Sequence, residues 1–104
     1  IGFPTANIWL PKNNLPIRGV FSVKTQIDGS GMKGIANMGV RPTVGGTHPV
    51  LEVHVFELER DIYGKRMNVE FVSKIRDEKK FDNLEELKSQ ILLDVEEAKK
   101  TLEK

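Results

Sequence analysis

The sequence predicts a mainly β domain: a closed or nearly closed antiparallel Greek-key barrel of five or six short strands, followed by one C-terminal helix. The apolar pattern has a period of two before Asp82 and a helical period after it. Strands followed by one terminal helix favour antiparallel β structure over alternating βαβ units. Short strands leave exposed edges unless their sheet closes, which favours a barrel. A length of 104 residues fits one domain with one core.

The first segment, residues 2–7, is expected to be extended. Pro4 lacks an N–H and restricts Phe3 before it to β or polyproline geometry. Thr5 and Asn7, two residues apart, then face the same side. Their hydroxyl and carboxamide oxygens are ligands that Mg²⁺ accepts beside phosphate oxygens, and this suggests nucleotide chemistry. The alternative is that these residues simply form a turn after a strand.

The next segments predict a hairpin and then a loop. Residues 19–27 and 32–38 alternate as strands and are joined by the turn residues 28–31. The side chains that share one face of the first strand are Phe21, Val23, Thr25 and Ile27. Residues 41–49 are rich in Gly and Pro, so the sequence predicts a long irregular loop there.

Two further strands are expected to form a second hairpin. Residues 50–58 give the strongest strand pattern, and apolar residues alternate again over residues 67–72. The turn between them is predicted at residues 61–65.

The last segment predicts a helix over about residues 83–103, after strands that end near residue 75 and a loop at 76–82. Asp82 and Glu85 have the spacing of a capping box. The apolar stripe is Leu84, Leu87, Ile91, Val95, Ala98 and Leu102. This stripe is expected to pack on the sheet, and the alternative is a helix that binds a partner.

Glu52 is the candidate general base. Residues 50–58 are apolar on both faces, which predicts a central strand, yet Glu52 and His54 share one of these faces. An unpaired carboxylate buried there would favour its neutral form and could accept a proton from a hydroxyl. The alternative is a Glu paired with a neighbouring Lys, Arg or His. His54 is expected to be structural, with a bond to Glu52 as one option, and the alternative is a catalytic role.

The stretch before the helix is also unusual. Five consecutive charged residues, 76–80, precede Phe81. This pattern fits a solvated loop, whereas Phe81 could act as a hydrophobic staple or as one wall of a pocket for a planar ring.

Composition excludes several kinds of site. No cysteine is present, which excludes disulfides and thiolate chemistry, and two histidines make a structural zinc site unfavourable. A balance of 16 basic and 15 acidic residues argues against a nucleic-acid binder. We expect a cytoplasmic protein, because no run long enough for a membrane span and no secretory signal is visible. No Walker, dinucleotide-binding or kinase-loop motif occurs.

Five motifs in register nevertheless resemble the riboflavin kinase family, and more narrowly the C-terminal kinase module of bacterial bifunctional riboflavin kinase/FAD synthetases. They cover essentially the whole chain and lie at residues 2–7, 41–43, 51–54, 61–64 and 76–82. The resemblance implies a six-stranded Greek-key barrel with a C-terminal helix, and a riboflavin kinase domain over residues 1–104. It also implies transfer of the γ-phosphate of ATP to the 5′-hydroxyl of riboflavin, which gives FMN and ADP.

Residue roles follow from the same resemblance. Glu52 matches the catalytic base, while Thr5 and Asn7 match the ligands of Mg²⁺, or another divalent cation, and of the nucleotide. Further nucleotide-binding positions match Val55, Glu57 and Tyr63. The positions that match the flavin-binding loop are Arg76, Lys79 and Phe81.

The resemblance also implies which further parts the parent chain contains. Family members carry a first strand and a glycine- and arginine-rich phosphate loop before the segment that matches residues 2–7, so we expect a truncated first strand. We also expect an N-terminal FMN adenylyltransferase domain in the parent chain. The alternative function is a non-catalytic small β-barrel that binds a ligand or serves assembly.

Overall fold

The computed structural model describes residues 5–9, 17–56 and 66–103, which form five strands and one helix. In chain order the elements are β1 (Thr5–Trp9), β2 (Gly19–Ile27), β3 (Ser30–Thr43), β4 (Gly46–Val55), β5 (Met67–Arg76) and α1 (Leu84–Leu102). The predicted mainly β fold with a C-terminal helix is confirmed.

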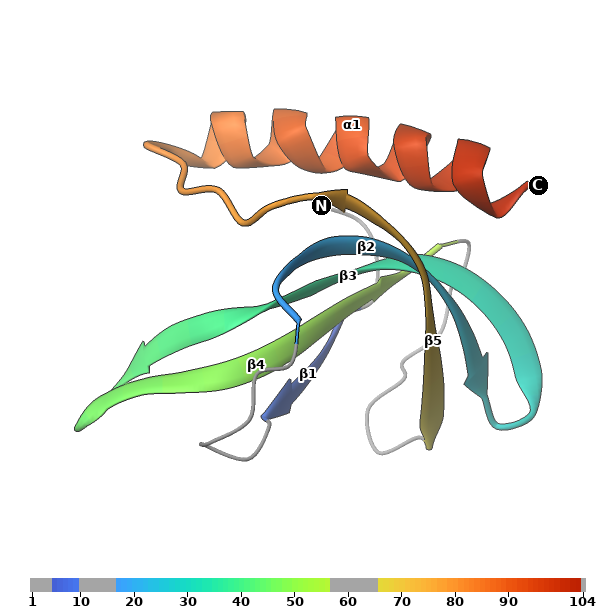
Figure 1. The fold of residues 1–104 in the computed structure, drawn as a ribbon, viewed down its shortest axis with the longest axis horizontal. Coiled ribbons are helices and arrows are strands. Elements are labelled where there is room, and N and C mark those ends of the chain that lie inside the picture. Colours follow the sequence, from blue (N-terminus) through green and yellow to red (C-terminus); the bar gives the residue numbers. More distant parts are fainter. Residues whose placement is uncertain (1–4, 10–16, 57–65, 104) are drawn as a thin grey trace.

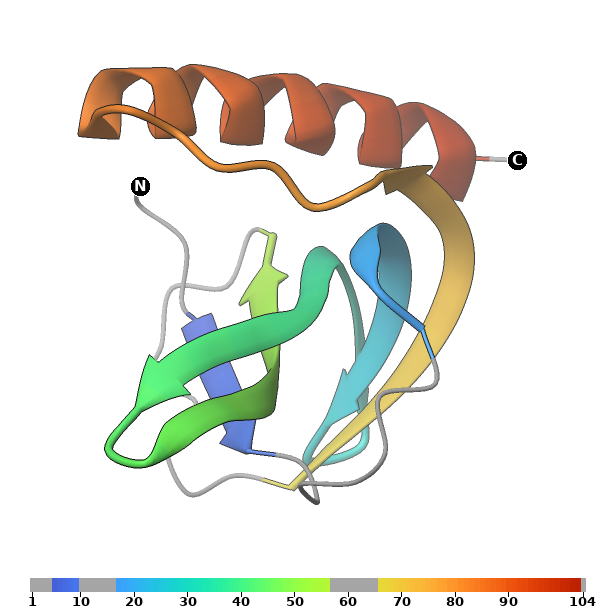
Figure 2. The same cartoon turned by 60° about the vertical axis from the view of Figure 1, so that its left-hand side comes forward.

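The five strands form one antiparallel sheet in the order β1-β4-β3-β2-β5. The sheet curls strongly, and α1 lies across one side of it (Figures 1 and 2). Among the described strands β1 and β5 remain the two edges, so the barrel is nearly closed rather than closed.

The predicted pairing of the fourth and fifth strands is wrong. Strand β5 pairs with β2 along its length instead of forming a hairpin with β4. This pairing places Phe71 against Phe21 in an edge-to-face contact, with ring centroids 5.2 Å apart. Local alternation predicts each of the two strands. The pairing of β5 with β2, however, depends on contacts such as Phe21 with Phe71, which are far apart in the sequence.

The predicted loop over residues 41–49 is also wrong, because β3 and β4 form a long ribbon closed by a tight turn at Val44 and Gly45. Pro42 and Pro49 lie in this ribbon, beyond the ends of β1 and β2. A proline is tolerated where no third strand needs its N–H, since the missing donor then costs no ladder bond.

The sheet carries an apolar cluster on each of its faces. Inside the curl, the buried residues of the inner cluster come from β2, β3 and β4: Phe21, Val23, Ile27, Ala36, Met38, Leu51, Val53 and Val55. The second cluster joins the outer face to the helix and consists of Ile35, Phe56, Ile91, Val95, Ala98 and Leu102. Strand β4 contributes to the inner cluster and lies between two strands, as its pattern predicted.

Helix α1 packs on the sheet as expected, although its first turn differs from the prediction. Asn83, not Asp82, is the N-cap, and its side chain accepts a hydrogen bond from the Glu86 N–H. Leu84 is 63% exposed, because the helix begins beyond the edge of the apolar cluster. Asp94 is buried within the apolar face.

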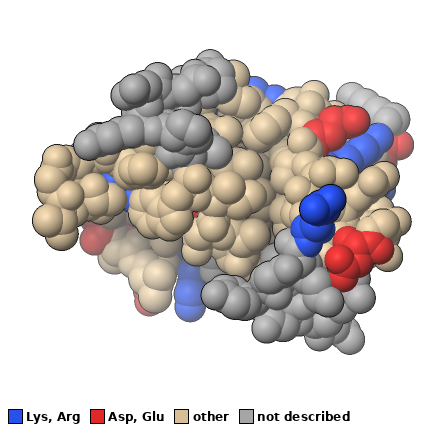
Figure 3. Space-filling view, turned by 90° about the horizontal axis from the view of Figure 1, so that it is seen from below, with Lys and Arg blue, Asp and Glu red and all other residues tan. Residues whose placement is uncertain are grey.

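On the side opposite α1, the visible charged side chains form small groups of both signs separated by uncharged surface (Figure 3). No helix in the described part of the chain has the length and apolar character needed to cross a membrane.

Candidate active site

A row of facing residues crosses the sheet from edge to edge. Asn7 of β1 pairs with Glu52 of β4, Glu52 pairs with Asn37 of β3, and Asn37 pairs with Val20 of β2. Val20 in turn pairs with Arg76 of β5. Directly opposed residues of antiparallel strands have side chains on the same face, about 5 Å apart. The pairing therefore brings the predicted metal ligand Asn7, the predicted base and the predicted flavin-binding Arg76 onto one line.

Part of this row lines a cavity of about 380 Å³ between the sheet, the segment before the helix and the first half of α1. From the sheet the lining residues are Val20, Ile35, Asn37, Arg41, Glu52 and His54. The other side is lined by Arg76, Glu78, Lys79, Phe81, Leu87, Ile91 and Asp94. The cavity thus joins Glu52 to all three residues predicted to bind flavin, although they lie more than twenty positions away in the sequence.

Glu52 is paired with an arginine. Arg41 donates a hydrogen bond to its carboxylate, and the same guanidinium lies 3.7 Å from the carboxylate of Glu78. Gly39 makes this arrangement possible, because a side chain there would collide with Glu78. Arg18 also bonds Glu78, at 3.3 Å. The sequence had left open whether Glu52 is paired, and its partner is an arginine from the ribbon mistaken for a loop.

Thr5 and His54 meet at the β1 side of the site. The two residues pair across the strands, and Thr5 Oγ1 lies 2.8 Å from His54 Nδ1. Burial lowers the pKa of His54 below its ordinary value, and the nearby carboxylate of Glu52 opposes this effect. A neutral His54 can accept a hydrogen bond from the Thr5 hydroxyl at Nδ1. A bond of His54 to Glu52 was one option from the sequence, and the structure instead pairs His54 with Thr5.

Arg76 is held by the helix. Its Nε and Nη2 atoms bind both carboxylate oxygens of Asp94, at 2.9–3.1 Å, and Gln90 donates to Asp94 at 3.0 Å. Asp94 is 2% exposed, so this is a buried bidentate pair. The Arg76 guanidinium and the Lys79 ammonium each lie 5.8 Å from the centroid of the Phe81 ring. The two cations and the buried pair therefore hold the Phe81 ring close to the N-terminus of α1.

The remaining predicted site residues are placed differently. Val55 is fully buried in the inner cluster, so it can offer a ligand only its backbone. Glu57 and Tyr63, predicted to bind nucleotide, lie outside the described residues. Thr5 and Asn7 adjoin the cavity through the strand pairing with His54 and Glu52 but do not line it.

Polar cavity residues that were not predicted as site residues include Arg41, Glu78, Asp94 and Asn37. Asp94 follows Ile91 by three residues, so a carboxylate inside the predicted apolar stripe was a usable signal for a buried pair. Asn37 interrupts an apolar run between Ala36 and Met38, and a carboxamide within such a strand is a weaker signal. The structure shows what these signals mean, because Asp94 and Asn37 line the cavity between the sheet and the helix.

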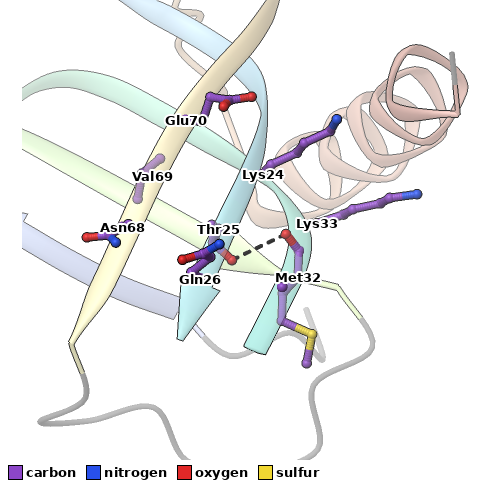
Figure 4. A pocket seen from close by; sticks show the side chains of 9 residues that line it. Lys24, Thr25, Gln26, Met32, Lys33, Asn68, Val69 and Glu70 are labelled. Atoms are coloured by element: carbon purple, nitrogen blue, oxygen red, sulfur yellow. Dashed lines mark hydrogen bonds between the residues drawn. The ribbon is translucent and has the colours of Figure 1, made fainter. Parts of the chain in front are cut away.

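A second hollow, of about 460 Å³, lies on β2, β3 and β5 away from the row (Figure 4). Thr25 donates a hydrogen bond to the Met32 carbonyl at 3.4 Å there, while the side chains of Lys24 and Lys33 extend outward into solvent. Glu70 is the one carboxylate among its lining residues. The hollow is larger than the cavity at Glu52, but it lacks converging charged groups, so we place the candidate site at Glu52.

Known proteins match this chain over nearly its whole length. A family model described as Flavokinase, riboflavin kinase, matches residues 1–102. The bifunctional riboflavin kinase/FMN adenylyltransferase of Haemophilus influenzae is 51% identical over 100 residues, and that of Escherichia coli K12 is 45% identical over 97. These matches cover 95% and 90% of this chain, which spans 32% and 30% of the two relatives.

A solved structure described as a macrolide-efflux protein from Streptococcus pneumoniae has the same fold, with a TM-score of 0.80 and 33% identity. The similarity covers 94% of this chain and 33% of that protein. Its described role differs from that of the sequence relatives, so this similarity supports the fold alone. Because the family model spans nearly the whole sequence, this chain belongs to the riboflavin kinase family.

Proposed function

We propose that this domain transfers the γ-phosphate of ATP to the 5′-hydroxyl of riboflavin and releases FMN and ADP. The observation that carries the proposal is the cavity in which Glu52 meets Arg76, Lys79 and Phe81. Family membership and the names of the bifunctional relatives support the choice of acceptor. In a parent chain like those relatives, FMN would next reach an N-terminal adenylyltransferase domain.

Glu52 acts as the base in this proposal. The riboflavin hydroxyl oxygen attacks the γ-phosphorus, its proton passes to the Glu52 carboxylate, and the bond to the β-phosphate oxygen breaks as ADP leaves. Glu52 has to exchange its bond with Arg41 for the substrate hydroxyl. Arg41 already lies near Glu78, so its charge stays paired when Glu52 turns to the substrate.

Thr5 and Asn7 are proposed to hold Mg²⁺, or another divalent cation, together with the phosphates. The donor chemistry fits, because both side chains carry hard neutral oxygen atoms and lie on one face of β1. Among the described residues, no group of three or more His, Cys, Asp or Glu could hold a metal. A magnesium ion bound mainly by phosphate and neutral oxygens needs no such cluster, and it would neutralise charge during transfer.

The flavin ring is proposed to lie against Phe81, with Lys79 at its edge. Arg76 is bonded to Asp94 and lies over the Phe81 ring, so the main contribution of Arg76 is to position that ring.

The test is to incubate the protein with ATP, Mg²⁺ and riboflavin and to separate the flavins by chromatography. FMN formation that requires all three components is expected. A version extended upstream of Ile1 is assayed in parallel as a control. If neither version forms FMN or changes flavin fluorescence on titration, the alternative of a non-catalytic assembly barrel is favoured.

The metal assignment has its own test. Thr5→Val keeps the side-chain shape and removes the hydroxyl, so Mg²⁺-dependent ATP binding should weaken while riboflavin binding without nucleotide changes little. The reverse pattern would assign this segment to the flavin side.

A further inference from the structure

Asn37 carries an unsatisfied polar atom in the candidate site. Within residues 5–9, 17–56 and 66–103, its Oδ1 is the one buried side-chain nitrogen or oxygen without a hydrogen-bond partner. An unpaired buried acceptor destabilises a protein, and nearly all such atoms in folded proteins are bonded. The exception here lies in a residue that lines the cavity beside Glu52.

The position of Asn37 is defined by the row across the sheet. It lies directly between Glu52 on β4 and Val20 on β2, and Arg76 follows Val20. With strands about 4.8 Å apart, Asn37 is one strand from Glu52 and two strands from Arg76. Any ligand that reaches from the Arg76 and Phe81 end of the cavity to Glu52 has to pass over Asn37.

The lining residues around Asn37 offer different chemistry. Val20 and Ile35 are apolar, and Arg41 is already engaged with the carboxylates of Glu52 and Glu78. Asn37 is neutral and offers both an acceptor and a donor. A carboxylate in its place would add a second negative charge beside Glu52 and close to the transferring phosphate.

We infer that Asn37 binds the polyol chain of the acceptor and thereby sets the position of its terminal hydroxyl at Glu52. This inference rests on the proposed function, in which the acceptor has a planar ring at one end and a reacting hydroxyl at the other. Hydroxyl groups of the chain between them can donate to Oδ1 and accept from Nδ2, which satisfies the acceptor that the protein itself leaves unpaired.

The test compares Asn37→Val with the wild type. Valine suits a strand and removes both polar ends of the side chain. Riboflavin and lumiflavin, which has the same ring with a methyl group in place of the polyol, are titrated by fluorescence. The variant should lose about fivefold to tenfold in riboflavin affinity, the usual effect of one hydrogen bond, and keep its affinity for lumiflavin.

Stability provides the second readout. The melting temperature of Asn37→Val without ligand should not fall, because the substitution removes an unpaired acceptor. Ser22→Ala is the matched control: Ser22 is a buried polar residue of the neighbouring strand whose hydroxyl bonds the Ser73 carbonyl at 3.3 Å. That variant should melt lower without changing the ratio of the two flavin affinities.

Three outcomes would overturn the inference. Equal losses of affinity for riboflavin and lumiflavin would place Asn37 at the flavin ring. A lower melting temperature with an unchanged ratio of the two affinities would mean that Asn37 has a structural role. A wild type that binds neither flavin would instead reject the proposed function itself. Asn37→Ser, which keeps a donor and an acceptor, should recover part of the riboflavin affinity, and it serves as the test variant if the valine protein does not fold.

Discussion

The two faces of strand β4 differ in what they hold. The inner face contributes Leu51, Val53 and Val55 to the apolar cluster inside the curl. The outer face presents Glu52 and His54 to a cavity, where Glu52 meets an arginine and His54 meets Thr5. The inner face is closed by the sheet itself, whereas the outer face is covered only in part by the helix. The difference shows that a largely apolar strand can still present reactive side chains on one face. In β4 this is the face that the helix α1 covers only in part.

The largest expected effect comes from comparing changes at two adjacent residues of β4, Glu52 on the outer face and Val53 on the inner face. Glu52→Gln should lower kcat by roughly 10² to 10⁴, because the amide is isosteric but cannot take the hydroxyl proton. Steady-state kinetics with saturating ATP and riboflavin measure the loss. ATP binding and the melting temperature should stay close to wild type.

Val53→Ala is the matched change on the inner face. It should lower the free energy of unfolding by about 2 kcal/mol through lost burial and a cavity, while the folded fraction keeps its kcat. Near-normal turnover in Glu52→Gln would remove Glu52 from the mechanism and with it the proposed contrast between the two faces.

A second prediction concerns how the helix holds the outer face. Asp94→Asn leaves the partly buried Arg76 guanidinium without a counter-charge, so the free energy of unfolding should fall by about 3 kcal/mol. Urea denaturation measures the loss. Asp77→Asn removes an exposed carboxylate that pairs with Lys74, and it should leave the midpoint unchanged. Equal effects of the two changes would show that the buried pair does not anchor the segment before the helix.

A third prediction concerns the ring of Phe81, which lines the cavity. Phe81→Ala should weaken riboflavin binding by about tenfold, because a planar contact is lost, and leave MgADP binding near wild type. Fluorescence titration measures the first and calorimetry the second. Hydrogen exchange over residues 76–81 should also slow when riboflavin and MgADP are added. If the loss is instead confined to MgADP, the flavin and nucleotide sides of the cavity must be exchanged.

The smallest effect is a pH dependence of stability at His54. Burial lowers the pKa of His54 below 6.5, its ordinary value, which the unfolded chain regains. The unfolded state therefore binds more protons just below pH 6.5, so stability due to His54 is complete above that pH and declines as the pH falls toward the folded-state pKa. Urea midpoints between pH 5 and pH 8 measure the slope. His54→Asn should flatten it, and an unchanged slope would exclude His54 as its source.

Local pattern determined much of this protein. The alternation of residues 19–27 set the first hairpin and its inner face, and the helical stripe from Leu87 to Leu102 set the packing of the helix. The motifs at both ends of the chain indicated the family that the comparison then showed. These features depend on neighbours in the sequence, so the sequence could predict them.

The tertiary structure decided the rest. The partner of β5, the ribbon through Pro42 and the pairing of Glu52 with Arg41 all depend on which strands lie side by side. Asn37 and Asp94 look like interruptions of apolar patterns until the sheet places one beside Glu52 and the helix places the other against Arg76. The physical reason is that burial and pairing of polar groups are set by contacts between distant segments, and only the folded chain creates those contacts.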